Sequence, residues 1–218
     1  MAATSNASGG VRLVVLLVLL GISMFLLVNK NLFLDNVASW RRGTATFSLD
    51  LNTLSGDLTE AGVLRRFPEL ELRCQAAPAD IQNLGDRVCY NYAKRFDGYG
   101  AHFVAFFLRE GRLSSMKVDV PWWWHAAMEK RLIERYGQPT GRQVLPSGDQ
   151  RLEGWQLAQG SVFYNRDPDL NPLQWNSVFW MSDRQIEQIG GSFVQGASEP
   201  NATRAQMLRW LLGKLIHS

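Results

Sequence analysis

The sequence predicts an α+β fold, in which a single N-terminal transmembrane helix precedes a small domain with an antiparallel β-sheet packed by helices. Three observations predict it. Sixteen residues from Leu13 to Val28 carry no charge. Later segments alternate apolar and polar residues, which is the period of a half-buried strand. Between these segments, apolar residues recur at helical spacing and are bounded by capping and breaking residues.

The composition is that of a globular protein and excludes some classes of function. The chain has 218 residues, of which 46% are hydrophobic and 20% are charged, so wholesale disorder is excluded. Arg12 and Lys30 both precede the first acidic residue, Asp35. Without these two, the rest of the chain has 21 basic and 20 acidic residues and is nearly neutral. A nucleic-acid partner needs a clustered basic surface, so none is expected.

Residues 11–30 are the predicted membrane anchor. A helix that crosses the hydrocarbon needs roughly 17–25 residues, and the run reaches this length if Arg12 and Lys30 extend their charges to the two interfaces. A cleaved signal peptide has a shorter apolar core, and its best cleavage site here, residues 36–38, is poor. A buried helix of a soluble protein would show a polar face. We therefore expect an uncleaved signal-anchor.

The side of the membrane on which the domain lies is not decided by positive charge. Arg12 lies on one flank, and Lys30, Arg41 and Arg42 lie on the other. The tail of residues 1–10 is short enough to be the cytoplasmic end of a chain whose large domain is exported.

Two cysteines supply a stronger argument about the compartment. Cys74 and Cys89 are the only ones and lie fifteen positions apart in the domain. In an oxidising compartment they would form one disulfide, whereas in the cytosol they would be two buried thiols. We expect the disulfide, with the domain on the non-cytoplasmic side, most simply a bacterial inner membrane facing the periplasm.

The remaining chain divides by composition into four parts. We expect a juxtamembrane connector at 31–43, an α+β domain at 44–190, a linker rich in Gly and Ser at 191–202 and an amphipathic helix at 203–218. In the connector, Trp40 lies beside two arginines, which suits a position at the level of the lipid headgroups.

The first half of the domain predicts a strand and two short helices. Apolar residues alternate from Ala45 to Leu51, which predicts a strand. Thr59 is the expected cap of a helix that Pro68 ends. Pro78 begins another expected short helix.

Two hairpins give the clearest pattern in the second half. The first pairs 103–108 with 113–120 through a Glu-Gly turn, and the second pairs 155–157 with 161–164. A helix is expected at 122–136, a strand at 173–181, and a helix from Ser182 to Ile189 with a capping box. Together these elements predict a sheet of about five or six strands with helices on one face.

No arrangement of residues typical of catalysis or metal binding is present. The chain has no nucleophile elbow, no phosphate-binding loop and no clustered zinc ligands. His125 and Glu129 are one helical turn apart, a spacing that more often makes a surface contact than an acid–base pair. We therefore expect no enzyme activity, no catalytic or metal-binding residues and no cofactor.

Trp122, Trp123 and Trp124 form the first candidate contact surface. Successive helical residues point about 100° apart, so three indole rings cannot all enter one core. An exposed ring would stack on a sugar, contact a hydrophobic partner or lie at a membrane interface. In the alternative, two rings pack against the first hairpin and the third covers the start of the helix.

The C-terminal helix is the second candidate contact surface. Its apolar stripe consists of Leu208, Leu211, Leu212, Leu215 and Ile216. The helix also carries three basic residues and no acid, which suits an anionic membrane surface or a partner protein. The alternative is that it packs on its own domain.

These observations favour a membrane-anchored extracytoplasmic accessory or scaffold protein of an envelope assembly. It would be integral to the membrane through one span and would meet a protein partner at the membrane surface, where anchoring raises its effective concentration. The alternative is a binding module for an amphiphilic or glycan ligand that uses an aromatic surface.

Overall fold

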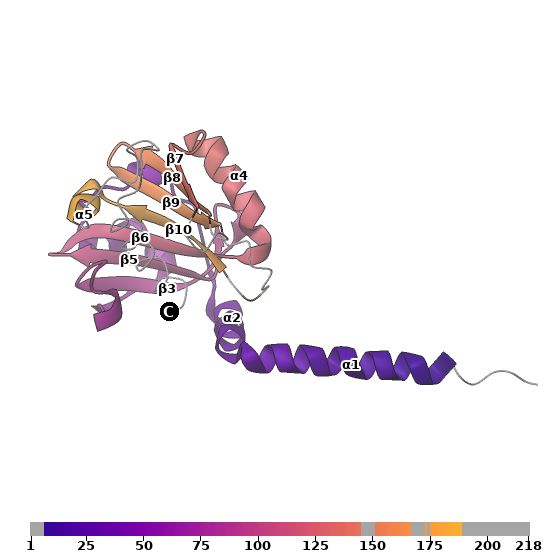
Figure 1. The fold of residues 1–218 in the computed structure, drawn as a ribbon. Helices are drawn as coiled ribbons and strands as arrows, with labels where there is room; N and C mark the ends of the chain where they lie inside the picture. The colour runs from indigo at the N-terminus through magenta and orange to yellow at the C-terminus, as the bar shows by residue number, and fades with distance from the viewer. Residues whose placement is uncertain (1–6, 145–150, 167–172, 174, 189–218) are drawn as a thin grey trace, which may run out of the picture.

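The computed structural model describes residues 7–144, 151–166, 173 and 175–188. An apolar helix, α1 (Ala7–Val28), leads through Asn29 into a second helix, α2 (Lys30–Arg42), and the β-rich domain follows (Figure 1). The linker expected at 191–202 and the helix expected at 203–218 lie outside the described residues.

The domain is built on one sheet, which confirms the predicted α+β class. The strand order is β1-β3-β5-β6-β10-β9-β8-β7, and β2 and β4 also pair with β3. All pairs are antiparallel except β1 with β3. The strands are β1 (Ala45–Phe47), β2 (Arg73–Ala76), β3 (Arg87–Phe96), β4 (Tyr99–Gly100), β5 (Phe103–Arg109), β6 (Arg112–Pro121), β7 (Gly141–Val144), β8 (Arg151–Leu157), β9 (Gly160–Arg166) and β10 (Trp175–Met181). The described part of the chain thus holds ten strands, and the expected five or six is wrong.

Both predicted hairpins are confirmed, and their strands are longer than expected. The β5–β6 turn places Glu110 and Gly111 at positive φ, as a tight turn requires. The β8–β9 hairpin turns just before Gly160, which also has positive φ. The predicted strand at 173–181 is present as β10, which joins the two hairpins by pairing with β6 and β9.

The strands that were not predicted lack an alternating pattern. The longest of them, β3, is covered on both sides along part of its length, so its sequence does not alternate. The strand expected over 45–51 is shorter, because the Asp50 side chain accepts a hydrogen bond from the Asn52 N–H and turns the chain. Ala45, Leu49 and Leu51 are nevertheless buried, as the pattern predicted.

The helices follow their capping residues. The Thr59 hydroxyl caps α3 (Glu60–Arg66) by accepting a hydrogen bond from the Gly62 N–H. The Ser182 hydroxyl caps α5 (Asp183–Gln188) by accepting one from the Gln185 N–H. The α-helix α4 (His125–Tyr136) begins three residues later than expected. The three tryptophans before it form a 3-10 turn, so the predicted start at residue 122 is wrong.

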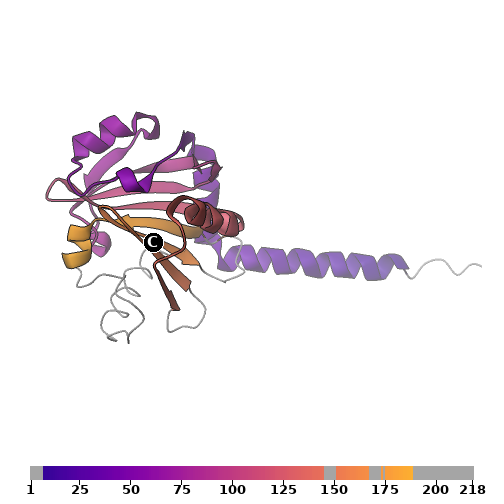
Figure 2. The same cartoon turned by 90° about the horizontal axis from the view of Figure 1, so that it is seen from above.

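Apolar residues pack on both faces of the sheet. On the first face, Met116 and Val118 of β6 lie in one cluster with Met128 and Leu132 of α4. On the second face, Phe107 and Phe179 cluster with residues that include Ile186 of α5. The expectation that helices cover one face only is therefore wrong. Figure 2, which views the molecule from above, shows α5 near the left end of the strands and α4 near the right end.

The segment after the apolar helix is helical and is attached to the domain. Asn29 separates α1 from α2, and its side chain donates to the Phe25 carbonyl at 2.9 Å. In α2, Asn36 donates to the Leu173 carbonyl at 2.9 Å and Ser39 donates to the His102 carbonyl at 3.0 Å. The expected connector is thus a helix that is hydrogen-bonded to one end of the sheet.

Candidate binding cavity beside the second helix

A cavity of about 440 Å³ lies on the second face of the sheet, next to α2. A volume of this size falls within the range of ligand pockets. Its described lining comes from α2, from the segment around β2, from β3, β5 and β6, and from the first residue of β10. These residues are Asp35, Ser39, Gln75, Pro78, Asp80, Ile81, Val88, Tyr90, Tyr92, His102, Phe103, Ala105, Phe107, Lys117, Asp119 and Trp175.

Aromatic and aliphatic side chains form most of the cavity wall. Alternate residues of a strand share one face, and Val88, Tyr90 and Tyr92 of β3 all line the cavity. Ala105, the register partner of Tyr90 on β5, lines it as well. The Phe103 ring lies 5.6 Å from the ring of Tyr90 and 6.2 Å from that of Tyr92, between centroids. The wall is thus suited to an apolar or planar group.

A buried ion pair forms part of the polar lining. Lys117 and Asp119 lie two positions apart on β6, and the Lys117 Nζ is 3.2 Å from the Asp119 Oδ2. The Ser177 hydroxyl donates to the other Asp119 oxygen at 2.5 Å. Removing one partner of such a pair would leave an uncompensated buried charge, which is strongly destabilising.

His102 joins the cavity to α2. Its Nδ1 is 2.8 Å from the Ser39 Oγ, and its ring meets the Trp175 ring edge-on at 4.8 Å. The residue is only 8% exposed, and burial lowers the pKa of His102 to about 4. The imidazole is therefore neutral at pH 7.

The contacts of Ser39 fix the tautomer of that imidazole. The single Ser39 hydroxyl proton is donated to the His102 carbonyl, which can only accept. The Nδ1 must then carry a proton and donate to the Ser39 Oγ. The Nε2 is left as an acceptor, and it is buried without a hydrogen-bond partner among the residues that the structure describes.

The predicted tryptophan surface is separate from the cavity. Trp123 is 57% exposed and Trp124 is 38% exposed, and the Trp124 ring lies edge-on to Tyr99 with 5.6 Å between centroids. None of the three tryptophans is among the described residues that line the cavity. Their role as a contact surface stays a prediction.

The second predicted surface, the stripe of Leu208, Leu211, Leu212, Leu215 and Ile216, lies outside the described residues. The predicted pair of His125 and Glu129 does meet, with 3.9 Å between the His125 Nε2 and a Glu129 oxygen. The His125 ring is also stacked on that of Tyr164 at 5.4 Å. This packing between α4 and β9 gives the histidine a structural role.

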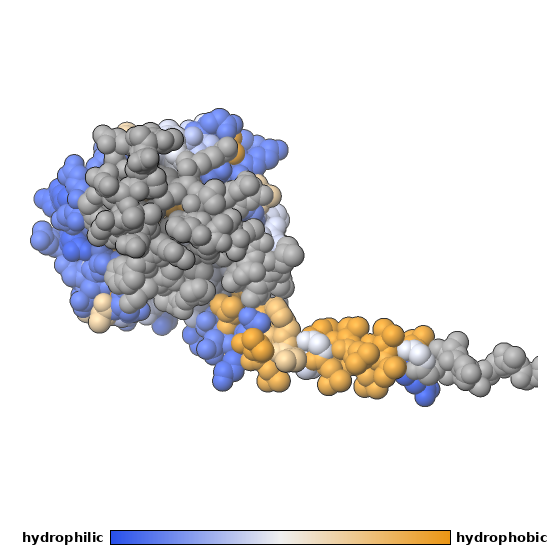
Figure 3. Space-filling model, in the orientation of Figure 1, coloured by the Kyte–Doolittle hydropathy of each residue, from blue (hydrophilic) through white to orange (hydrophobic). Residues whose placement is uncertain are grey.

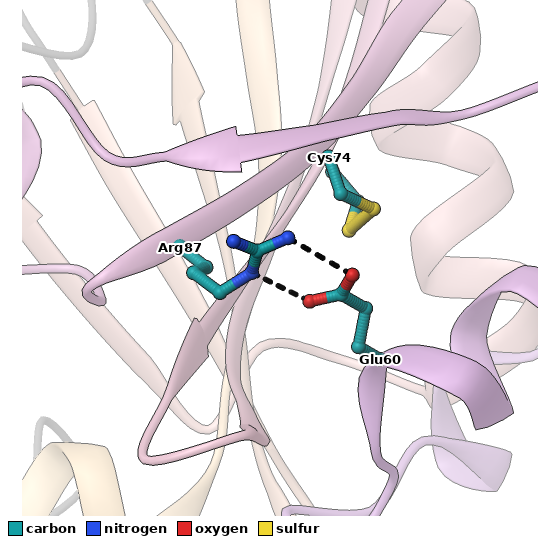
Figure 4. The surroundings of a disulfide bond; sticks show 4 residues. Glu60, Cys74 and Arg87 are labelled. Carbon is teal, nitrogen blue, oxygen red and sulfur yellow. Dashed lines mark hydrogen bonds and ion pairs between the residues drawn. A yellow bond between two sulfur atoms is a disulfide. The ribbon is translucent and has the colours of Figure 1, made fainter.

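The expected disulfide is present and joins two adjacent strands. Cys74 of β2 and Cys89 of β3 are register partners, and their sulfurs are bonded (Figure 4). Beside them, Glu60 of α3 accepts two hydrogen bonds from Arg87, at 2.6 and 3.0 Å. The Glu60 carboxylate lies near both sulfurs, but bonded sulfurs are not the thiolates that bind a metal.

Sequence reasoning missed the cavity because its residues come from six separate segments. One signal was available: Lys117 and Asp119 are charged residues within a strand that otherwise reads as buried. Both faces of that strand are covered, so the charges required a partner inside the protein.

No protein-family model, no curated protein and no solved structure matches this chain.

Proposed function

We propose that this chain is a non-enzymatic, membrane-anchored extracytoplasmic accessory protein whose domain binds an amphiphilic ligand in the cavity beside α2. One observation carries the proposal. The cavity combines an aromatic wall with a few polar groups, which include the carboxylates of Asp35 and Asp119 and the ammonium of Lys117. Few convergent polar groups in an apolar cavity are typical of a ligand site.

The anchor is supported by the length and exposure of α1. Gly10–Val28 is long and apolar enough to cross a membrane, and none of it is buried against the domain. At 1.5 Å per residue it spans roughly 28 Å, close to the thickness of the hydrocarbon core. Figure 3 shows these hydrophobic residues as a rod that projects from the domain.

The Cys74–Cys89 disulfide supports a location outside the cytosol. Structural disulfides persist in oxidising compartments such as the bacterial periplasm and are rare in the cytosol. The disulfide favours a domain on the periplasmic side of an inner membrane.

The polar lining indicates the chemistry of the ligand headgroup. The described lining has three carboxylates, those of Asp35, Asp80 and Asp119, and one ammonium, that of Lys117. Such a lining favours a headgroup that donates hydrogen bonds, such as a hydroxylated or amine group, and disfavours an anionic one.

The test uses the full chain in lipid nanodiscs with fluorescent amphiphiles of equal chain length. We expect an alkyl glycoside or alkylamine to bind and an alkyl sulfate to bind about tenfold more weakly or not at all. Ala105→Phe, which places a ring inside the cavity, should weaken binding about tenfold or more. The matched control is Ala158→Phe, because Ala158 is exposed in the β8–β9 turn.

A second variant covers the case in which Ala105→Phe fails to fold. Asp35→Asn keeps the shape of the side chain but removes one carboxylate of the lining, and it should weaken binding of the alkylamine selectively. Equal binding of all amphiphiles by the wild type and both folded cavity variants would contradict the proposal.

The scaffold role remains the second candidate function. The observation that favours it is the exposure of the Trp123 and Trp124 rings. Co-purification from solubilised membranes tests the scaffold role. A scaffold should still co-purify with a protein partner after Ala105→Phe, whereas a ligand-binding protein should have no such partner and should lose its amphiphile.

A further inference from the structure

We propose that the domain rests on the bilayer, with the outer side of α2 and the exposed rings of Trp123 and Trp124 in the lipid headgroup region. The partner is the lipid surface around the anchor itself. The inference rests on α1 being the membrane anchor of the proposed function, and it adds an orientation that a flexible tether would not impose.

The direction of α2 is the first observation. Figures 1 and 2 show that α2 turns away from the axis of α1 directly after Asn29. If α1 crosses the bilayer, α2 must therefore run along its surface. Its hydrogen bonds to Leu173 and His102 attach it to the domain, so the domain follows the direction of α2.

The outer side of α2 carries the side chains of an interfacial helix. Asn36 and Ser39 face the domain, whereas Phe33, Leu34 and Trp40 are exposed. Leu34 is 59% exposed and Trp40 is 84% exposed, which is unusual for large apolar residues at the surface of a soluble protein. Next to an integral helix, the environment that accepts them is the lipid interface.

The charges at the two ends of α2 agree with this environment. Lys30 begins the helix, and Arg41 and Arg42 end it. Basic residues beside a membrane segment attract anionic headgroups, and tryptophan is enriched at the same depth. Asp35 lies on the cavity side instead.

The tryptophan turn lies at the same end of the sheet as α2. Pro121, which precedes the turn, is the register partner of Trp175. The Trp175 ring contacts His102, and His102 is bonded to Ser39 of α2. This chain of contacts places the tryptophan turn at the same end of the sheet as α2, and Figure 1 shows α4, which follows the turn, on the side of the domain toward which α1 projects.

Site-directed fluorescence in vesicles tests the orientation. The two native cysteines are bonded, so single cysteines can be introduced at Leu34, Trp123 and Leu20 and labelled with an environment-sensitive fluorophore. Ala158→Cys, in the exposed β8–β9 turn, is the matched control. The full chain is reconstituted in vesicles of phosphatidylcholine and phosphatidylglycerol that contain lipids with a nitroxide at headgroup depth or at acyl-chain depth.

The proposal predicts that the labels at positions 34 and 123 shift their emission to shorter wavelength and lose most of it to the shallow nitroxide. The label at 158 should do neither, and the label at 20 should respond to the deep nitroxide. If 34 and 123 behave as 158 does while 20 is quenched, the anchor stands and the orientation is wrong. If 20 is not quenched, the membrane anchor of the proposed function is wrong as well.

Discussion

At the scale of residues, the fold strongly alters the chemistry of His102. Its ring is buried among Ser39, Trp175 and the cavity wall, and burial lowers its pKa from 6.5 to about 4. A neutral imidazole held in one tautomer is a directional acceptor, which a freely titrating surface histidine would not be.

The lowered pKa of His102 predicts a pH dependence of stability. Between about pH 6.5 and about pH 4 the unfolded chain binds a proton at this residue and the folded chain does not. Stability is therefore lost as the pH falls through this window, by about 2 kcal/mol between pH 7 and pH 5. Denaturant unfolding at both values measures the loss.

The matched variant for that experiment is His102→Gln, which keeps a polar side chain and removes the titration. Other groups titrate alike in both proteins, so the difference between the two unfolding free energies isolates His102. Parallel pH curves for wild type and variant would show that the buried histidine does not govern this window.

The sequence alone identified some residues and not others for physical reasons. Cys74 and Cys89 had no alternative partners, so their pairing followed from composition and compartment. His102 gave no signal, because a lone histidine between two strands is equally compatible with a surface position. Its role depends on Ser39, which lies 63 positions away in the chain.

At the scale of elements, the disulfide holds β2 to the edge of β3. The β2 strand has four residues, and the segment that connects it to β3 contains only a short 3-10 turn. The cross-link supports a strand that has little packing of its own, and it supports the segment around Ile81 that lines the cavity.

Replacing both cysteines by alanine should therefore cost about 3 kcal/mol, the value expected for a loop of this length. Reduced and oxidised wild type, compared by urea unfolding, should differ by a similar amount. In the double-alanine variant we also expect faster amide hydrogen exchange in β2 than in β5. Unchanged stability in both comparisons would mean that the bond adds nothing to the fold.

Elements were predictable where the pattern was local. The β5–β6 and β8–β9 hairpins each carry a Gly-containing turn between apolar runs, and both are confirmed. The β3 strand was missed because both of its faces are covered along part of its length, so its sequence does not alternate. The start of α4 was misplaced because Pro121 and the tryptophans favour a tight turn before the helix proper.

At the scale of the whole molecule, the apolar helix α1 leads through α2 to the end of the sheet where the cavity lies. The anchor-side end holds α2, His102 and Trp175, which contribute to the cavity lining, and the tryptophan turn, which does not. A ligand taken from the membrane would thus meet the cavity close to the lipid surface. This arrangement depends on tertiary contacts and was not predictable from local patterns.

The central claim is that α1 holds the domain on the outer side of the inner membrane, and cysteine labelling in intact cells tests it most directly. Ala158→Cys marks the domain and Ala7→Cys marks the N-terminal end, both in cells whose outer membrane has been made permeable. A membrane-impermeant maleimide should label position 158 at once and position 7 only after lysis, on a chain of full length. Labelling of position 7 but not 158 in intact cells, or a shortened chain without α1, would contradict the account.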